Sequence, residues 1–78
     1  MDDETGIIKV VAETVRRARK AAGLSQEALA FEAGLDRTYI SQVEREKRNV
    51  TIVVLARIAK ALKTTPDRLL IPPRKTKG

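Results

Sequence analysis

The spacing of apolar residues predicts a first helix near the N-terminus. Between residues 7 and 22, apolar side chains recur at intervals of three and four, which places them on one face of an α-helix. The members of this stripe are Ile8, Val11, Val15, Ala18 and Ala22. Gly23 follows the stripe, and glycine is common just after the end of a helix. We therefore expect this helix to pack on the rest of the fold through one face.

Two short helices joined by a tight turn are predicted next, between residues 25 and 45. Ser25 and Asp36 can each accept hydrogen bonds from the unpaired N–H groups at the start of a helix. Gly34 lies between the two helices and allows the backbone a positive φ. The side chains expected to face the core are Leu29, Ala30, Ala33, Leu35, Ile40 and Val43, with Tyr39 beside them. Helices this short must be held by packing.

A fourth helix is predicted after Thr51 and a short fifth helix after Thr65. Thr51 is a favourable capping residue, and Pro66 suits the first position of a helix because its missing N–H would have no partner there. The expected core face of the fourth helix consists of Ile52, Leu55, Ile58 or Ala59, and Leu62. The pair Pro72 and Pro73 would stop the fifth helix. No segment forms a convincing strand, so the predicted fold class is all-α.

Length and composition indicate one small domain without a metal centre. The 78 residues leave room for a single domain, which we expect at residues 7–71, between a frayed acidic segment (1–6) and a disordered basic tail (72–78). The chain has no cysteine and no histidine, which excludes disulfides, zinc sites and histidine-based acid–base catalysis. A glycine-rich phosphate loop is also absent from the sequence. We therefore expect no cofactor, no metal and no enzyme activity.

The charge of the chain favours a polyanion as partner. The formal net charge is +6, and residues 5–78 carry 16 basic against seven acidic side chains, because three of the ten acids lie in the first four positions. A domain this basic favours nucleic acid, with a basic surface that has no partner as the alternative. The acidic N-terminus is unlike a signal peptide, and no apolar run approaches a membrane span. We therefore expect a cytoplasmic protein that binds no membrane.

The two short helices and their turn have the form of a helix-turn-helix. In such units the second helix enters the major groove of DNA with its first residues toward the base edges. Arginine can donate to guanine O6 and N7, glutamine can pair with adenine N6 and N7, and threonine can contact a thymine methyl group. The candidates for reading bases are Arg37, Thr38, Ser41 and Gln42, each with backbone contact as the alternative. The candidates for binding phosphate are Ser25, Gln26, Tyr39, Arg45, Lys47, Arg48 and Asn49. Arg16, Arg17 and Lys20 are expected to be solvated, with a second DNA contact as the alternative.

One helix-turn-helix reads too few base pairs to select a site. A good bidentate base contact contributes about 1–3 kcal/mol of discrimination, whereas useful selection needs about 4–10 kcal/mol over non-specific binding. A two-fold dimer doubles the contacts and spaces its half-sites by about one turn of the double helix. The apolar residues available for a dimer interface are Val53, Val54, Leu69, Leu70 and Ile71. The alternative is that they fill the junction between the fourth and fifth helices.

Several motifs resemble the Xre/lambdoid-repressor helix-turn-helix family. They are R-x-x-R-K-x-x-G-L-S-Q (16–26), L-S-Q-E-A-L-A (24–30), A-G-L (33–35), D-R-T-Y-I-S-Q-V-E-R (36–45) and L-x-x-I-A-K-A-L (55–62). The resemblance implies the compact five-helix fold of a lambda-repressor-like DNA-binding domain. It also implies that four side chains face DNA, namely Gln26, Arg37, Thr38 and Gln42. A further implication is an ion pair between Arg19 of the first helix and Glu44 of the third.

The run D-R-T-Y-I-S (36–41), followed by Arg48 and Asn49, is similar to the controller proteins of restriction–modification systems. These are single-domain dimers that regulate their own promoter and that of the endonuclease. Two positions depart from the family pattern, because Glu46 and Lys63 stand where glycine is usual. Both positions often need a left-handed backbone, so the departures concern the ends of the third and fourth helices. The Glu46 carboxylate would also lie near the expected path of the DNA backbone and weaken phosphate contact there.

The sequence therefore predicts a homodimeric regulator of transcription that binds double-stranded DNA on a (pseudo)palindromic operator. RNA polymerase is a further candidate partner, and repression and activation both stay open as modes of action. An antitoxin or a phage-type repressor is an alternative to a controller protein. A protein-interaction adaptor that uses the same fold without DNA is an alternative of another class. The adaptor hypothesis predicts partner binding that is insensitive both to salt and to Arg37→Ala.

Overall fold

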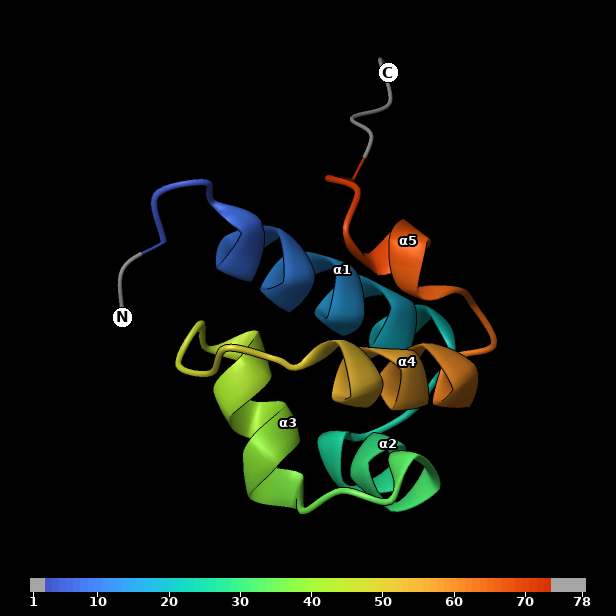
Figure 1. The fold of residues 1–78 in the computed structure, drawn as a ribbon. Helices are drawn as coiled ribbons and strands as arrows, with labels where there is room; N and C mark the ends of the chain where they lie inside the picture. The colour runs from blue at the N-terminus through green and yellow to red at the C-terminus, as the bar shows by residue number, and fades with distance from the viewer. Residues whose placement is uncertain (1–2, 74–78) are drawn as a thin grey trace.

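The computed structural model describes residues 3–73, which form five α-helices (Figure 1). The helices are α1 (Ile7–Ala21), α2 (Gln26–Ala33), α3 (Arg37–Glu44), α4 (Ile52–Ala61) and α5 (Pro66–Leu69). α2 and α3 pack against each other, α1 contacts α3 and α5, and α4 contacts α2 and α5. The described part of the chain contains no strand. The predicted all-α class with five helices is confirmed.

The core collects the apolar faces of all five helices. Its largest fully buried side chains are Val15, Leu29, Ile40, Val43 and Ile58. The other buried apolar residues are Val11, Ala12, Ala30, Ala33, Leu55, Ala59, Leu62 and Leu69. These lists include every core position predicted for α2, α3 and α4 except Ile52 and the half-buried Leu35. The apolar spacing therefore located most of the core correctly.

Two positions of the predicted apolar stripes are exposed. Ile52 is 83 % exposed. It is the first residue of α4, and at about 100° per residue it falls at the edge of the stripe that Leu55 and Ile58 centre. Ala22 is also exposed because α1 ends at Ala21 and Ala22 only caps it. Both predictions fail at a helix end, where the neighbouring helices no longer cover the side chain.

The predicted helix starts are mostly confirmed. Ser25 Oγ accepts a hydrogen bond from the backbone N–H of Ala28 at 2.9 Å, and Thr51 Oγ1 accepts one from Val54 at 3.1 Å. Asp36 occupies the capping position of α3 but makes no capping hydrogen bond with its side chain. The turn between α2 and α3 uses Gly34 at φ 71°, a conformation that costs glycine little.

The first described residues form a capping turn for α1. The two carboxylate oxygens of Asp3 accept hydrogen bonds from the backbone N–H groups of Ile8 at 3.2 Å and Lys9 at 3.1 Å. A carboxylate is favourable at the positive end of a helix dipole. The sequence predicts a frayed segment at residues 1–6, of which residues 1 and 2 lie outside the described residues, and Asp3 caps α1 within the rest.

The predicted disordered tail lies outside the described residues from position 74 onward. Pro72 and Pro73 follow α5 as non-helical residues, which agrees with their predicted role as a stop. None of the described helices has the length and apolar character needed to cross a membrane.

Two helices end on a left-handed residue that is not glycine. Glu46 has φ 62° after α3, and Lys63 has φ 58° after α4. After α3, Glu46 N–H donates to Val43 O at 3.2 Å and Lys47 N–H donates to Gln42 O at 2.8 Å. These two bonds form the Schellman arrangement, whose left-handed position is usually glycine. The sequence departures from the family pattern therefore fall on strained backbone positions.

Replacing Glu46 or Lys63 with glycine is expected to stabilise the fold by about 0.5–1 kcal/mol for each change. A left-handed backbone costs an L-residue about 1–2 kcal/mol, and the larger conformational freedom of unfolded glycine offsets part of that gain. Urea denaturation followed by circular dichroism measures the change. The matched control is Lys47→Gly next to Glu46, which relieves no strain and should lower stability. A lower midpoint for both glycine variants would contradict the prediction.

Candidate nucleic-acid interface

α3 presents one face to solvent and buries the other. Ile40 and Val43 are enclosed by the core, whereas Arg37 and Thr38 in the first turn are exposed. α2 packs directly against α3, and the turn between them is closed by a hydrogen bond from Leu35 N–H to Ala30 O at 2.8 Å. Figure 1 shows α3 at one edge of the molecule, with α2 next to it. This is the geometry of a helix-turn-helix that offers its second helix to a groove.

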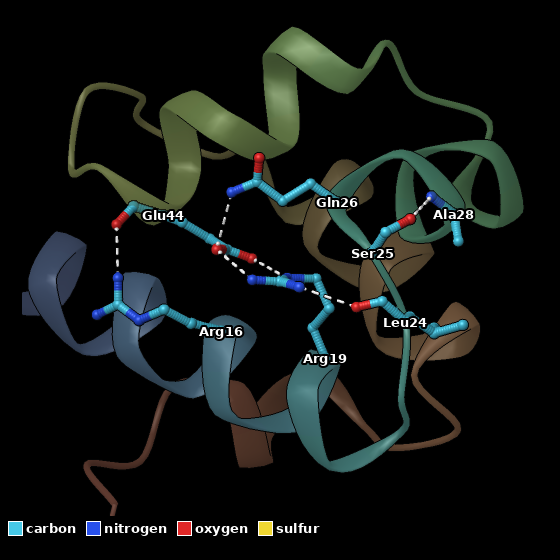
Figure 2. Close-up of polar contacts among 7 residues, drawn as sticks. All are labelled: Arg16, Arg19, Leu24, Ser25, Gln26, Ala28 and Glu44. Atoms are coloured by element: carbon cyan, nitrogen blue, oxygen red, sulfur yellow. Dashed lines mark hydrogen bonds and ion pairs between the residues drawn. The ribbon is translucent and has the colours of Figure 1, made fainter.

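Glu44 at the end of α3 holds the helix-turn-helix to the scaffold (Figure 2). Arg19 of α1 donates to both carboxylate oxygens, from Nε to Oε2 at 2.6 Å and from Nη2 to Oε1 at 3.0 Å. Its Nη1 also donates to Leu24 O at 2.8 Å. Gln26 Nε2, at the start of α2, donates to Glu44 Oε1 at 3.1 Å, and Arg16 Nη1 donates to Glu44 O at 3.2 Å. These contacts fix the relative positions of α1, α2 and α3.

The Arg19–Glu44 ion pair is nearly enclosed. The exposed fractions of the two side chains are 12 % for Arg19 and 3 % for Glu44. The hydrogen bonds to Glu44 raise the pKa of Arg19 above its ordinary value, and burial of the guanidinium opposes that shift. Because the pKa is raised, the stabilisation by this group is fully present below the ordinary arginine pKa. The ion pair implied by the resemblance is confirmed.

Two residues of the sequence hypothesis have internal roles in this network. Arg16 is half-buried and donates to the end of α3, so the expectation that it is simply solvated is wrong. Gln26, a predicted phosphate contact, is half-buried and gives its amide to Glu44. Ser25, another predicted phosphate contact, uses its hydroxyl to cap α2. Phosphate contact by Ser25 and Gln26 stays a prediction.

The predicted base-reading residues differ in exposure. Arg37 and Thr38 are exposed, and Ser41 and Gln42 are half-buried. Among the predicted phosphate contacts, Arg45, Lys47 and Asn49 are exposed, and Tyr39 and Arg48 are half-buried. The exposed basic side chains follow the C-terminal end of α3.

A cluster that the sequence hypothesis missed joins three of these residues. Arg48 donates to Gln42 Oε1 from Nε at 3.1 Å and from Nη2 at 2.8 Å. Its guanidinium carbon also lies over the Tyr39 ring, 4.3 Å from the centroid, where a cation is attracted by the ring face. No periodicity marks a pair six residues apart across a helix end. Only the folded loop brings Arg48 back onto α3.

The predicted dimer residues divide into exposed and buried members. Val53 is 66 % exposed, and Leu70 and Ile71 are also exposed. Val54 is half-buried against the core, and Leu69 is 2 % exposed and belongs to the core. Leu69 therefore fills the junction between α4 and α5, which was the alternative considered for this set.

Other apolar residues are exposed beside the predicted dimer residues. Ile7 and Ile52 are exposed and line a pocket of about 110 Å³ together with Leu70. We call the exposed residues Ile7, Ile52, Val53 and Leu70 the apolar patch. The sequence prediction of a dimer interface included Val53 and Leu70 but neither Ile7 nor Ile52. Phe31 on α2 is 85 % exposed as well, and no predicted function includes it.

Comparison with known proteins places this geometry in a family. The helix-turn-helix family model HTH_3 matches residues 15–69. The control protein C.SmaI of Serratia marcescens is 52 % identical over 64 residues, which cover 82 % of this chain and 76 % of that protein. The crystal structure of the hypothetical transcription factor NHTF from Neisseria is similar with a TM-score of 0.86 and 41 % identity, covering 94 % of this chain and 84 % of the other.

One of the similar solved structures is a complex with DNA. The restriction–modification controller protein C.Esp1396I has been crystallised as a tetramer with its natural 35 base-pair operator. Its chain is 38 % identical, with a TM-score of 0.77, and the similarity covers 85 % of this chain and 87 % of that one. Family model, sequence relatives and structural neighbours agree, and the chain belongs to the HTH_3 family of helix-turn-helix proteins.

Proposed function

We propose that the chain is a sequence-specific regulator of transcription that binds double-stranded DNA as a homodimer. The observation that carries this proposal is the exposed first turn of α3, with Arg37 and Thr38, on a helix whose opposite face is buried. The Glu44 network supports it because it holds α3 at a fixed angle. A rigid probe loses little conformational entropy on binding.

The proposed interface separates base contacts from phosphate contacts. Arg37, Thr38, Ser41 and Gln42 would lie toward base edges, with Arg37 as the guanine reader. The exposed residues Arg45, Lys47 and Asn49 would follow the sugar–phosphate backbone, together with the N-terminus of α2, whose free N–H groups attract a phosphate. Glu46 would place a carboxylate near the same backbone and weaken the contact.

A dimer is proposed because one half-site gives too little selectivity. The interface would use the exposed apolar residues Val53, Leu70 and Ile71, extended by Ile7 and Ile52. Exposed apolar residues that gather on a small domain commonly mark an interaction site, and Ile7, Ile52 and Leu70 lie around one pocket. Two chains related by a two-fold axis would place their α3 helices about one turn of DNA apart.

Within this class, a controller protein of a restriction–modification system is the specific function that we propose. The named similarities to C.SmaI and C.Esp1396I favour it over an antitoxin or a phage-type repressor. Binding over a promoter would exclude RNA polymerase, and binding beside it would recruit polymerase, so RNA polymerase stays a proposed partner. The similarity to a control protein and to a hypothetical transcription factor favours a regulator over an enzyme, and we propose that the regulator acts in the cytoplasm.

Arg37→Ala tests the proposed reading helix. We expect it to weaken binding to a duplex selected from a random library by about 1–3 kcal/mol and to leave binding to a scrambled duplex almost unchanged. Fluorescence anisotropy titrations at several salt concentrations measure both affinities. The logarithm of the wild-type affinity should fall linearly with the logarithm of salt concentration.

The matched control is Arg45→Ala, since Arg45 is also an exposed arginine but follows the opposite, C-terminal end of α3, where it is proposed to contact phosphate. It should weaken both duplexes alike and reduce the salt slope by about one. If Arg37→Ala changed neither affinity nor preference, α3 would not be the reading helix. Binding that ignores salt and selects no sequence would favour the adaptor hypothesis.

A further inference from the structure

The contact between Arg48 and Gln42 determines what Gln42 can offer to a ligand. A carbonyl oxygen has two lone pairs, and Gln42 Oε1 accepts two hydrogen bonds from one guanidinium, at 3.1 and 2.8 Å. Arginine has donors only, so the atom facing Arg48 must be the amide oxygen and not the amide nitrogen. The orientation of the Gln42 amide is therefore set by chemistry.

Gln42 is left with donors and without a free acceptor. Its Nε2 carries two N–H groups, and no partner of Nε2 is present within residues 3–73. Glutamine pairs with adenine by accepting from N6 while donating to N7. The accepting half of that pairing is already occupied in this chain. The expected adenine reading therefore conflicts with the structure of the free protein.

Tyr39 restricts the movement of the Arg48 side chain that contacts Gln42. The Arg48 guanidinium lies 4.3 Å from the centroid of the Tyr39 ring, and Tyr39 itself packs against the core. Arg48 is thus held by a ring face on one side and by an amide oxygen on the other. A planar guanidinium suits this combination of stacking and forked donation, and a lysine ammonium does not.

We propose that Arg48 is a positioning residue that holds Gln42 as a hydrogen-bond donor, so that Gln42 selects acceptor-only base edges. Those edges are guanine, with N7 and O6, and thymine, with O4. Adenine and cytosine each present an amino donor in the major groove, and an acceptor is needed to read it. This inference rests on the proposed function, because it assumes that α3 lies in the major groove.

The experiment begins with duplexes selected from a random library by the wild-type protein. The base pair that Gln42 reads is the one at which Gln42→Ala loses its preference. Affinity is then measured for duplexes in which that pair carries single-atom changes. One set lacks the purine N7 or O6 acceptor, or the thymine O4 acceptor, and the other lacks an exocyclic amino group, as with purine in place of adenine. Arg48→Ala and Arg48→Lys are measured on the same duplexes.

The wild-type protein should lose about tenfold in affinity when the acceptor is removed and change less than twofold when the amino group is removed. Both Arg48 variants should shift the preference at this pair toward adenine and become sensitive to the amino group. Arg48→Lys keeps the positive charge, so a shared response separates orientation of Gln42 from general attraction to phosphate. Arg45→Lys is the control and should leave the preference at this pair unchanged.

A tenfold loss of wild-type affinity on removal of the amino group would overturn the inference, because Gln42 would then be accepting. Unchanged base preference in both Arg48 variants would overturn it too, as would a Gln42→Ala variant with no altered pair. In each of these outcomes the protein would still enrich a preferred DNA site, and its affinity would still fall as the salt concentration rises. Failure of the proposed function is different, since no sequence would then be enriched at all.

Discussion

Replacing Glu44 with glutamine is expected to lower the free energy of unfolding by about 3–5 kcal/mol. Glu44 is 3 % exposed and is bonded by Arg19 through two donors. Glutamine has nearly the same shape but no charge, so the Arg19 guanidinium would remain buried without a counter-charge. A small domain has about 5–15 kcal/mol of total stability. The removal of this one charge would therefore remove a large share of the total stability.

Urea denaturation followed by circular dichroism measures this loss. Glu32→Gln is the matched control, since Glu32 is an exposed carboxylate on α2, and its stability should change by less than about 0.5 kcal/mol. Arg19→Met combined with Glu44→Leu should recover part of the loss, because replacing both members of a buried pair by apolar residues removes the unpaired charge. An unchanged midpoint for Glu44→Gln would show that the network does not hold the helices.

The sequence predicted the parts of the fold that depend on local spacing. Apolar residues three and four apart located the buried faces of α2, α3 and α4, and Ser25 and Thr51 marked helix starts through their hydroxyl groups. These features depend on neighbours within one helical turn. The buried faces and the helix starts are therefore the same in any fold that buries the same face of each helix.

The sequence did not predict the features that depend on contacts between segments distant in the chain. Ile52 has the right spacing for the core, but no helix covers the first residue of α4, so it is exposed. Leu69 was a candidate both for a dimer interface and for the junction between α4 and α5, and the spacing did not decide between them. It is buried in the core, where its carbonyl accepts a hydrogen bond from Thr14 Oγ1 of α1 at 2.7 Å. The pairing of Arg48 with Gln42 depends on the path of one loop. Spacing within a helix carries no information on such contacts.

In the candidate site, too, the features that follow from the helix period were predicted, and those that depend on contacts with another segment were not. Exposure of Arg37 and Thr38 follows from the period of α3, since Ile40 and Val43 occupy the opposite face. The internal bonds of Gln26 and Gln42 do not follow from any period, because each partner comes from another segment. A polar side chain on the right face of a helix is thus predictable. The donor or acceptor that it leaves free is not.

Val53→Asp is expected to convert the proposed dimer into monomers and to weaken binding to the selected duplex by about 30-fold or more. Val53 is 66 % exposed, so the monomer fold should tolerate the change. At a two-fold interface each new carboxylate would be desolvated, with its symmetry mate nearby. A monomer reads one half-site and loses about half of the roughly 4–10 kcal/mol that separates specific from non-specific binding. Tenfold in affinity corresponds to about 1.4 kcal/mol, which gives the expected factor.

Sedimentation equilibrium measures the association, and anisotropy titration measures the affinity. Phe31→Asp is the matched control, because it introduces the same charge at a strongly exposed apolar residue of α2, which is not part of the proposed interface. It should leave both association and affinity near the wild-type values. Dissociation by Phe31→Asp and not by Val53→Asp would move the interface to the surface of α2. If both variants stayed dimeric, the apolar patch of Ile7, Ile52, Val53 and Leu70 would not be the contact, and the interface would lie on another surface of the molecule.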